Sequence, residues 1–198
     1  MRTLRLLLST AVFAQVLIVS RAQQTPDLQE RKETAGSAAA RYFTDVVLLD
    51  QDGNPKRLYS DLIKGRTIIV NAFFTTCHDS CPIMTARMVQ VQRALGEQLG
   101  KDVYILSLSV DPTQDTPAKL KAYGEQFKAK PGWFFLTGPK QDLEFALHKF
   151  GLLPGQKENH LDLFIIGNDR TGLWKKARGT APAQEIIAVV NSVLNDHP

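Results

Sequence analysis

The chain has 198 residues, of which 43% are hydrophobic and 22% charged, so it can bury one globular core but is too short for two full domains. Its 24 basic and 20 acidic residues give a formal net charge of +4 without a basic stripe. This composition predicts one domain and gives no electrostatic case for a nucleic-acid partner.

The amino terminus has the pattern of an export signal. Arg2 and Arg5 precede an apolar run over residues 6–19, and small residues follow at positions 20 and 22, the two that a signal peptidase inspects. As a helix the run would rise about 21 Å, short of the roughly 30 Å of bilayer hydrocarbon, so a cleaved signal at residues 1–22 is favoured over a retained anchor. We therefore expect an exported, periplasmic protein, which stays close to the membrane if the segment is retained. Cleavage removes three basic residues and no acid, leaving a nearly neutral chain with no electrostatic case for anionic lipid.

Residues 23–40 are small and polar without a sustained period, which is typical of a flexible linker, and the folded domain is expected over residues 41–198. Runs of β-branched and aromatic residues predict strands at 46–49, 67–74, 103–110, 133–136 and 161–166. Apolar residues at helical spacing, with Thr116-Pro117 as one start signal, predict helices at 82–99, 116–127, 140–150 and 182–194. Strands that alternate with helices indicate an α/β fold, with a mainly parallel central sheet covered by helices on both faces.

The segment FFTTCHDSCP carries the clearest chemistry. It places Cys77 just past a buried strand and Cys81 at the opening of the next helix, because Pro82 is tolerated only in a first helical turn. The positive end of that helix is expected to favour thiolates, which are both nucleophiles and metal ligands. Spacing of i, i+4 brings the two sulfurs to one face, near enough to close a disulfide or hold one soft ion.

A small structural disulfide is the alternative interpretation of this pair. Cys77 and Cys81 are the only cysteines of the chain, and in an exported protein they could oxidise. A bridge across a five-residue loop, however, restrains the unfolded chain little. The spacing therefore favours a functional pair over a structural one.

The order of motifs resembles the Sco (SenC-like) family over about residues 43–195. FFTTCHDSCP is followed by VDPTQDTP, KPGWFFLTG and NHLDLFIIGND, the last of which contains His160. The resemblance implies a thioredoxin-like fold, copper bound by Cys77, Cys81 and His160, and a role in assembling the copper A centre of cytochrome c oxidase. It also implies an alternative, since some members reduce disulfides. Asp111 matches another recurrent family position, for which we expect at most a supporting role, and Asn159 stands where many members carry an acid.

The proposed ligands are also chemically consistent. Two thiolates and one imidazole suit copper(I), with copper(II) as the alternative, whereas structural zinc would require a fourth protein ligand. His160 directly precedes the strand predicted at 161–166, and we expect parallel topology to bring it to the same sheet edge as Cys77.

Other candidate ligands have simpler explanations. His78 lies between the cysteines and is expected to be a solvated loop residue, and His148 and His197 are expected to face solvent. Met84 and Met88 share one helix face and are expected to pack in the core rather than bind metal.

Two functions therefore remain open at the level of the sequence. The first is a copper(I) metallochaperone that passes its metal to an oxidase subunit. The alternative is a thiol–disulfide oxidoreductase, in which Cys77 attacks a disulfide of an exported client and Cys81 resolves the mixed disulfide. A docking module would need neither cysteine, and a peroxiredoxin is disfavoured because residues 71–76 contain no proline.

Overall fold

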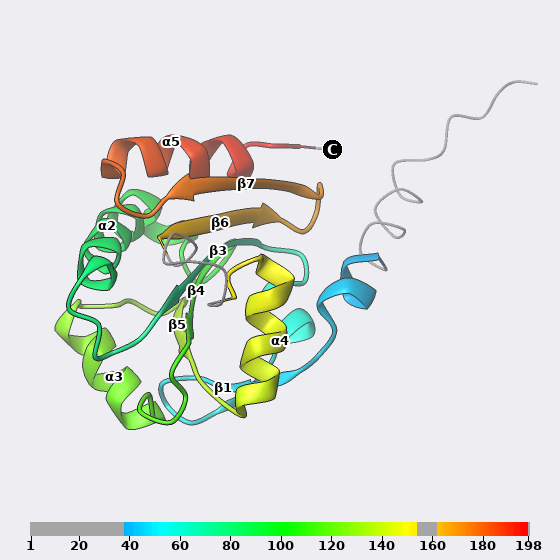
Figure 1. The fold of residues 1–198 in the computed structure, drawn as a ribbon. Coiled ribbons are helices and arrows are strands. Elements are labelled where there is room, and N and C mark those ends of the chain that lie inside the picture. The colour runs from blue at the N-terminus through cyan, green and yellow to red at the C-terminus, as the bar shows by residue number, and fades with distance from the viewer. Residues whose placement is uncertain (1–37, 154–161, 198) are drawn as a thin grey trace, which may run out of the picture.

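The computed structural model describes residues 38–153 and 162–197. These form a five-stranded sheet in the order β5-β4-β3-β6-β7 (Figure 1). Its strands are β3 (Thr67–Phe73), β4 (Val103–Ser109), β5 (Trp133–Leu136), β6 (Leu163–Asn168) and β7 (Leu173–Arg178). A separate antiparallel hairpin joins β1 (Val47–Leu49) to β2 (Pro55–Arg57) through a turn in which Gly53 has a φ of 79°.

Helices cover both faces of the sheet, as expected for the α/β class (Figure 1). The α-helices are α2 (Ser80–Leu95), α3 (Pro117–Gln126), α4 (Lys140–Phe150) and α5 (Ala183–Leu194), and residues 38–43 are also helical. A π-helix, η1 (Leu58–Ile63), and a 3-10 turn, η2 (Gly96–Gln98), complete the described elements. One apolar cluster packs α2, α3 and α5 on the sheet, and a second packs α4 and η1 on the opposite face. Within the described ranges, no helix combines the length and hydropathy needed to cross a bilayer.

The sheet is mixed rather than parallel throughout. Strands β5, β4 and β3 run parallel, as their connecting helices require, whereas β6 pairs antiparallel with β3 and β7 pairs antiparallel with β6. A turn at residues 169–172 joins these last two strands. The strand β7 was not predicted from the sequence.

The antiparallel direction of β6 decides which residues lie near the cysteines. Strand β3 ends at Phe73, and β6 begins at Leu163 at this same edge of the sheet, since Val70 pairs with Ile165 and Thr67 with Asn168. We expected a parallel strand to begin at the cysteine edge. That expectation is wrong about the direction of the strand: β6 begins at this edge because it is antiparallel to β3. A parallel strand would begin at the opposite edge.

Candidate metal and dithiol site

The two cysteines lie where β3 passes into α2. The Cys77 backbone N–H donates to the carbonyl oxygen of Phe74 at 3.2 Å, which closes a turn directly after the strand. Helix α2 begins at Ser80, so Cys81 lies in its first turn, as Pro82 predicted. Both cysteines are free and buried, with 9% of Cys77 and 2% of Cys81 exposed.

The two thiols interact directly. Burial, together with a side-chain hydrogen bond with Cys77, raises the pKa of the Cys81 thiol to about 12. A backbone hydrogen bond at Phe74 opposes this shift, and the charge of Asp162 adds to it. The expectation that the helix terminus makes Cys81 a ready thiolate is therefore wrong for the reduced protein. Desolvation outweighs the helix dipole here, because the side chain is removed from water.

A buried carboxylate anchors the loop that leads to Cys77. Asp115 is fully buried, and its Oδ1 accepts hydrogen bonds from the Thr75 backbone N–H at 3.1 Å and from the Thr75 hydroxyl at 2.5 Å. Its Oδ2 accepts from the Ser109 hydroxyl at 2.5 Å. The loop between β4 and α3 is thereby tied to the residue that stands two positions before Cys77.

A second set of bonds supports the first turn of α2. The Thr85 hydroxyl donates to the Cys81 carbonyl oxygen at 2.8 Å and lies 2.9 Å from the Tyr123 hydroxyl. Burial raises the pKa of Tyr123 to about 12, so its hydroxyl stays neutral. The Tyr123 ring packs 5.4 Å from that of Phe73, measured between ring centroids. The helix turn that carries Cys81 is thus tied to α3 and to the end of β3.

The two ends of the β6–β7 hairpin form a third side of the cysteine site, after the loop that Asp115 holds and the first turn of α2. The Gly179 N–H donates to the Asp162 carbonyl oxygen at 2.7 Å, and a Cβ at Gly179 would lie 2.5 Å from Cε of Met84. The residue after β7 therefore packs directly on α2, one helical turn from Cys81. One carboxylate oxygen of Asp162, Oδ1, is buried without a hydrogen-bond partner. This hairpin places an unneutralised carboxyl close enough to Cys81 to act on its thiol electrostatically.

The structure describes two of the three predicted ligands. Cys77 and Cys81 lie side by side, whereas His160 lies outside the described residues. Within residues 38–153 and 162–197, no three His, Cys, Asp or Glu side chains are grouped so as to hold a metal ion. Met84 and Met88 are buried in the core, as expected. The histidines expected in solvent are exposed, namely His78, His148 and His197.

In the VDPTQDTP segment, sequence reasoning singled out Asp111, with at most a supporting role, and missed Asp115. Asp111 is half-buried, and its carboxylate accepts only a 3.4 Å bond from the Gln114 N–H among the described contacts. Asp115, four residues later, makes the contacts with the cysteine loop. The sequence feature that could have pointed to Asp115 is its position directly before the Thr116-Pro117 start of α3, at the end of the loop that follows β4.

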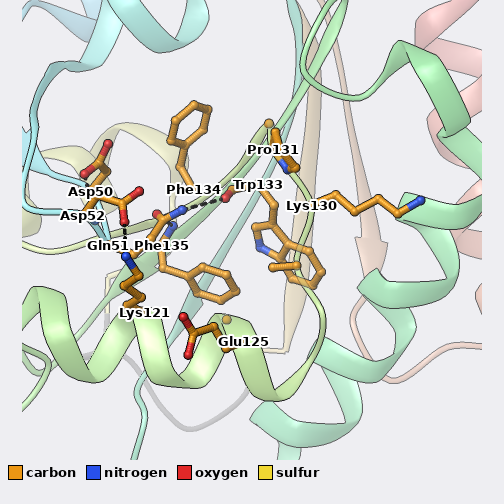
Figure 2. Close-up of a pocket in the computed structure, with 13 residues that line it drawn as sticks. Asp50, Gln51, Asp52, Lys121, Glu125, Lys130, Pro131, Trp133, Phe134 and Phe135 are labelled. Carbon is orange, nitrogen blue, oxygen red and sulfur yellow. Dashed lines mark hydrogen bonds and ion pairs between the residues drawn. The ribbon is translucent and has the colours of Figure 1, made fainter.

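A separate pocket of about 400 Å³ lies along β5, and no cysteine lines it (Figure 2). The Gln51 side chain runs beside the strand, where its amide Nε2 donates to the Trp133 carbonyl oxygen at 3.3 Å and its Oε1 accepts from the Phe135 N–H at 3.0 Å. Lys121 forms a 2.9 Å ion pair with Asp52 at the rim. This pocket follows the outer edge of the sheet and is not part of the dithiol site.

Known proteins are similar to this chain in sequence. The SCO1/SenC family model matches residues 34–195. A SCO1 protein homolog of Bacillus subtilis is 33% identical over 154 residues, which cover 72% of this chain and 78% of the relative. Alignments with several further curated relatives span only about half of those proteins.

Solved structures have the same fold. A SCO1/SenC family lipoprotein from Bacillus anthracis superposes with a TM-score of 0.62 at 30% identity, covering 75% of this chain and 92% of that one. Yeast Sco1 with copper bound superposes with a TM-score of 0.63 at 23% identity, covering 77% and 92% of the two chains. The fold is therefore thioredoxin-like, and the chain belongs to the SCO1/SenC family.

Proposed function

We propose that this protein is an exported metallochaperone that binds copper(I) through Cys77 and Cys81 with His160 as third donor, and that it passes the metal to an oxidase subunit during assembly of the copper A centre. The contact between the two cysteine thiols carries the proposal. Two adjacent sulfurs in an apolar cluster are a soft donor pair that excludes water, which suits copper(I). One matched structure is that of a member of the Sco family of cytochrome c oxidase assembly proteins. Another, yeast Sco1, has copper bound.

The third ligand is the least constrained part of the proposal. Asp162, two residues after His160, lies close enough to Cys81 for its charge to raise the pKa of that thiol. The start of β6 also lies at the sheet edge where β3 ends. Both observations support a site that His160, two positions before Asp162 in the sequence, would complete. Copper binding would displace the thiol protons, because a coordinating thiol is deprotonated by the metal.

The proposal is tested by competing the reduced protein against a chelator of known copper(I) affinity under anaerobic conditions. His160→Ala should weaken the affinity about 10- to 100-fold, and Cys77→Ser or Cys81→Ser should abolish tight binding. His78→Ala is the matched control, because this exposed histidine lies between the cysteines and should leave the affinity unchanged. Equal affinities of His160→Ala and the parent protein would remove His160 from the site.

Disulfide exchange is the second candidate function. Cys77 is the more exposed of the two cysteines, so its thiolate is the better placed to attack a client disulfide. This forms a mixed disulfide and releases one client thiolate. Cys81 then attacks the Cys77 sulfur, which releases the second client thiolate and leaves a Cys77–Cys81 disulfide. A matched Sco structure is described as containing a disulfide switch.

The two functions make different demands on His160. Disulfide formation needs only the two sulfurs, so titration of thiols against a glutathione buffer should give the same midpoint for His160→Ala and the parent protein. Loss of client-disulfide turnover in His160→Ala, together with unchanged copper affinity, would reject the metallochaperone and support the oxidoreductase.

A further inference from the structure

An apolar groove of about 560 Å³ lies between the helical residues 38–43, the end of α4 and the outer strands of the sheet. We call it the aromatic groove, after its lining residues Tyr42, Phe43, Phe150 and Trp174, which share it with Lys149 and Lys176. It contains neither cysteine, so the proposed copper chemistry does not account for it. Tyr42 is 50% exposed at its mouth, which places a large aromatic side chain at the surface beside the other apolar residues of the groove.

The aromatic side chains on the floor of the groove pack against one another. The Phe43 ring centroid lies 5.1 Å from that of Phe150 and 5.3 Å from that of Trp174. The indole lies flat on β6, because a Cβ at Gly167 would come within 2.2 Å of its ring carbon Cε3. Trp174 nevertheless remains half-buried, so part of the ring faces the groove rather than the core. The fold holds a partly exposed indole in a fixed position.

Positive charge lines the groove beside this apolar floor. The Lys149 Nζ lies 4.5 Å from the ring centroid of Tyr42, and the Tyr42 hydroxyl donates to the Lys149 carbonyl oxygen at 3.0 Å. Lys176 follows Trp174 by two positions on β7, so both side chains lie on the same face of the strand. No acidic residue is among those lining the groove. An occupant with an apolar body and an anionic head fits this combination.

The groove lies beside the start of the described domain, downstream of the segment that would keep the protein close to the membrane if it is retained. Ala38, the first described residue, lines the groove, and the apolar run at residues 6–19 lies upstream in the sequence. Tyrosine and tryptophan concentrate at membrane–water interfaces, where lysine can reach the phosphates. We propose that the aromatic groove docks the domain on an anionic phospholipid bilayer, with Tyr42 and Trp174 at the interface and Lys149 and Lys176 facing the headgroups. The nearly neutral overall charge of the mature chain did not reveal this site, because Lys149 and Lys176 make only one groove locally positive.

The two tryptophans make the test specific. Trp133 is 1% exposed inside the core, whereas Trp174 lies in the groove. The full chain is mixed with phosphatidylglycerol vesicles whose acyl chains carry bromine, which quenches nearby indoles. We expect quenching and a blue shift of Trp174 emission. The variant Trp174→Phe keeps only Trp133 and should show no quenching.

Two charge reversals on β7 provide a matched pair. Lys176→Glu should reduce the lipid-quenched fraction of Trp174 emission severalfold, because it places an anion opposite the phosphates. Lys175→Glu changes the net charge equally but lies on the other face, where the Lys175 Nζ donates to the Ser192 hydroxyl at 2.8 Å, and it should have little effect. Zwitterionic phosphatidylcholine vesicles should quench Trp174 less than phosphatidylglycerol vesicles.

Three results would overturn the proposal. The first is no quenching of the parent protein above that of Trp174→Phe. The second is an equal loss in Lys175→Glu and Lys176→Glu, which would reduce the effect to overall charge. The third is a blue shift without bromine quenching that grows with protein concentration, which would make a second copy of the chain the occupant.

Discussion

At the residue scale, the site depends on an acid that neither binds metal nor carries redox chemistry in our proposal. Asp115 has no exposed surface, and its two carboxylate oxygens accept bonds from the loop before Cys77 and from the end of β4. Hydrogen bonds to a charged acceptor are stronger than neutral ones, and a buried acceptor that loses its donors is costly. The conformation of the loop before Cys77 therefore depends on the hydrogen bonds that this one carboxylate accepts.

Replacing Asp115 with Asn should lower the free energy of unfolding by about 2–3 kcal/mol, because an amide presents N–H groups where the carboxylate accepts from two hydroxyls. Urea unfolding of the reduced protein measures the change. Asp111→Asn is the control, since this half-buried side chain makes only a long bond to Gln114, and it should cost less than about 0.5 kcal/mol. A larger loss in Asp111→Asn than in Asp115→Asn would reverse the assignment.

At the element scale, the outer edge of β5 is closed by a side chain instead of a strand. The Gln51 amide bonds the Trp133 carbonyl and the Phe135 N–H (Figure 2). The backbone of Leu49 then pairs with Thr137. A free strand edge can pair with another molecule, so covering these groups protects the sheet. Gln51 lies just past the first strand of the hairpin, and its position follows from the chain path between β1 and β2.

Gln51→Ala should lower the free energy of unfolding by about 1–3 kcal/mol and increase self-association, because it exposes the Trp133 carbonyl and the Phe135 N–H. Unfolding curves and light scattering after size-exclusion chromatography measure the two effects. Gln126→Ala serves as the control, because Gln126 is exposed at the end of α3. Faster hydrogen exchange at the Phe135 amide should accompany the change, and unaltered exchange would show that the edge is closed by other means.

The elements show where sequence patterns were sufficient. The buried strands β3 and β4 and the helices α2 to α5 were predicted within a few residues, because continuous apolar runs and helical periods mark them. Strand β7 was missed because its Lys175, Lys176 and Arg178 conceal the alternation of an edge strand. Its existence depends on pairing with β6, which no local pattern encodes. The direction of β6 was likewise invisible, since strand orientation is a tertiary property.

At the scale of the whole molecule, the site is part of the core. Cys77, Cys81, Phe73 and Met84 belong to the same apolar cluster as residues of α3 and α5. The sequence identified the cysteine pair from its spacing, but not its burial, because burial depends on how three distant segments pack over it. A change in the protonation of Cys81 therefore changes the free energy of unfolding of the whole domain.

This coupling predicts a pH dependence of unfolding. The pKa of Cys81 is raised from 9.0 to about 12 in the folded protein, so above pH 9 only the unfolded state loses this proton readily. The stabilisation is fully present below pH 9 and decreases as the pH rises toward 12, by about 1.4 kcal/mol per unit at most. Urea unfolding of the reduced protein between pH 8 and 10 should show a steeper fall for the parent than for Cys81→Ser. Parallel curves would mean that the thiol titrates normally.

The place of β3 in the sheet also has a consequence for the synthesis of the chain. Ile69 pairs with Ile105 on one side, but its partner on the other side is Ile166, and all seven residues of the strand are buried. While the polypeptide emerges, one edge of this apolar strand stays open until β6 has been made. Loop closure over such a separation slows folding and prolongs the exposure of aggregation-prone surface. A nascent chain that stops before Leu163 therefore carries this buried strand with one edge open, and only the last fifth of the sequence completes the sheet.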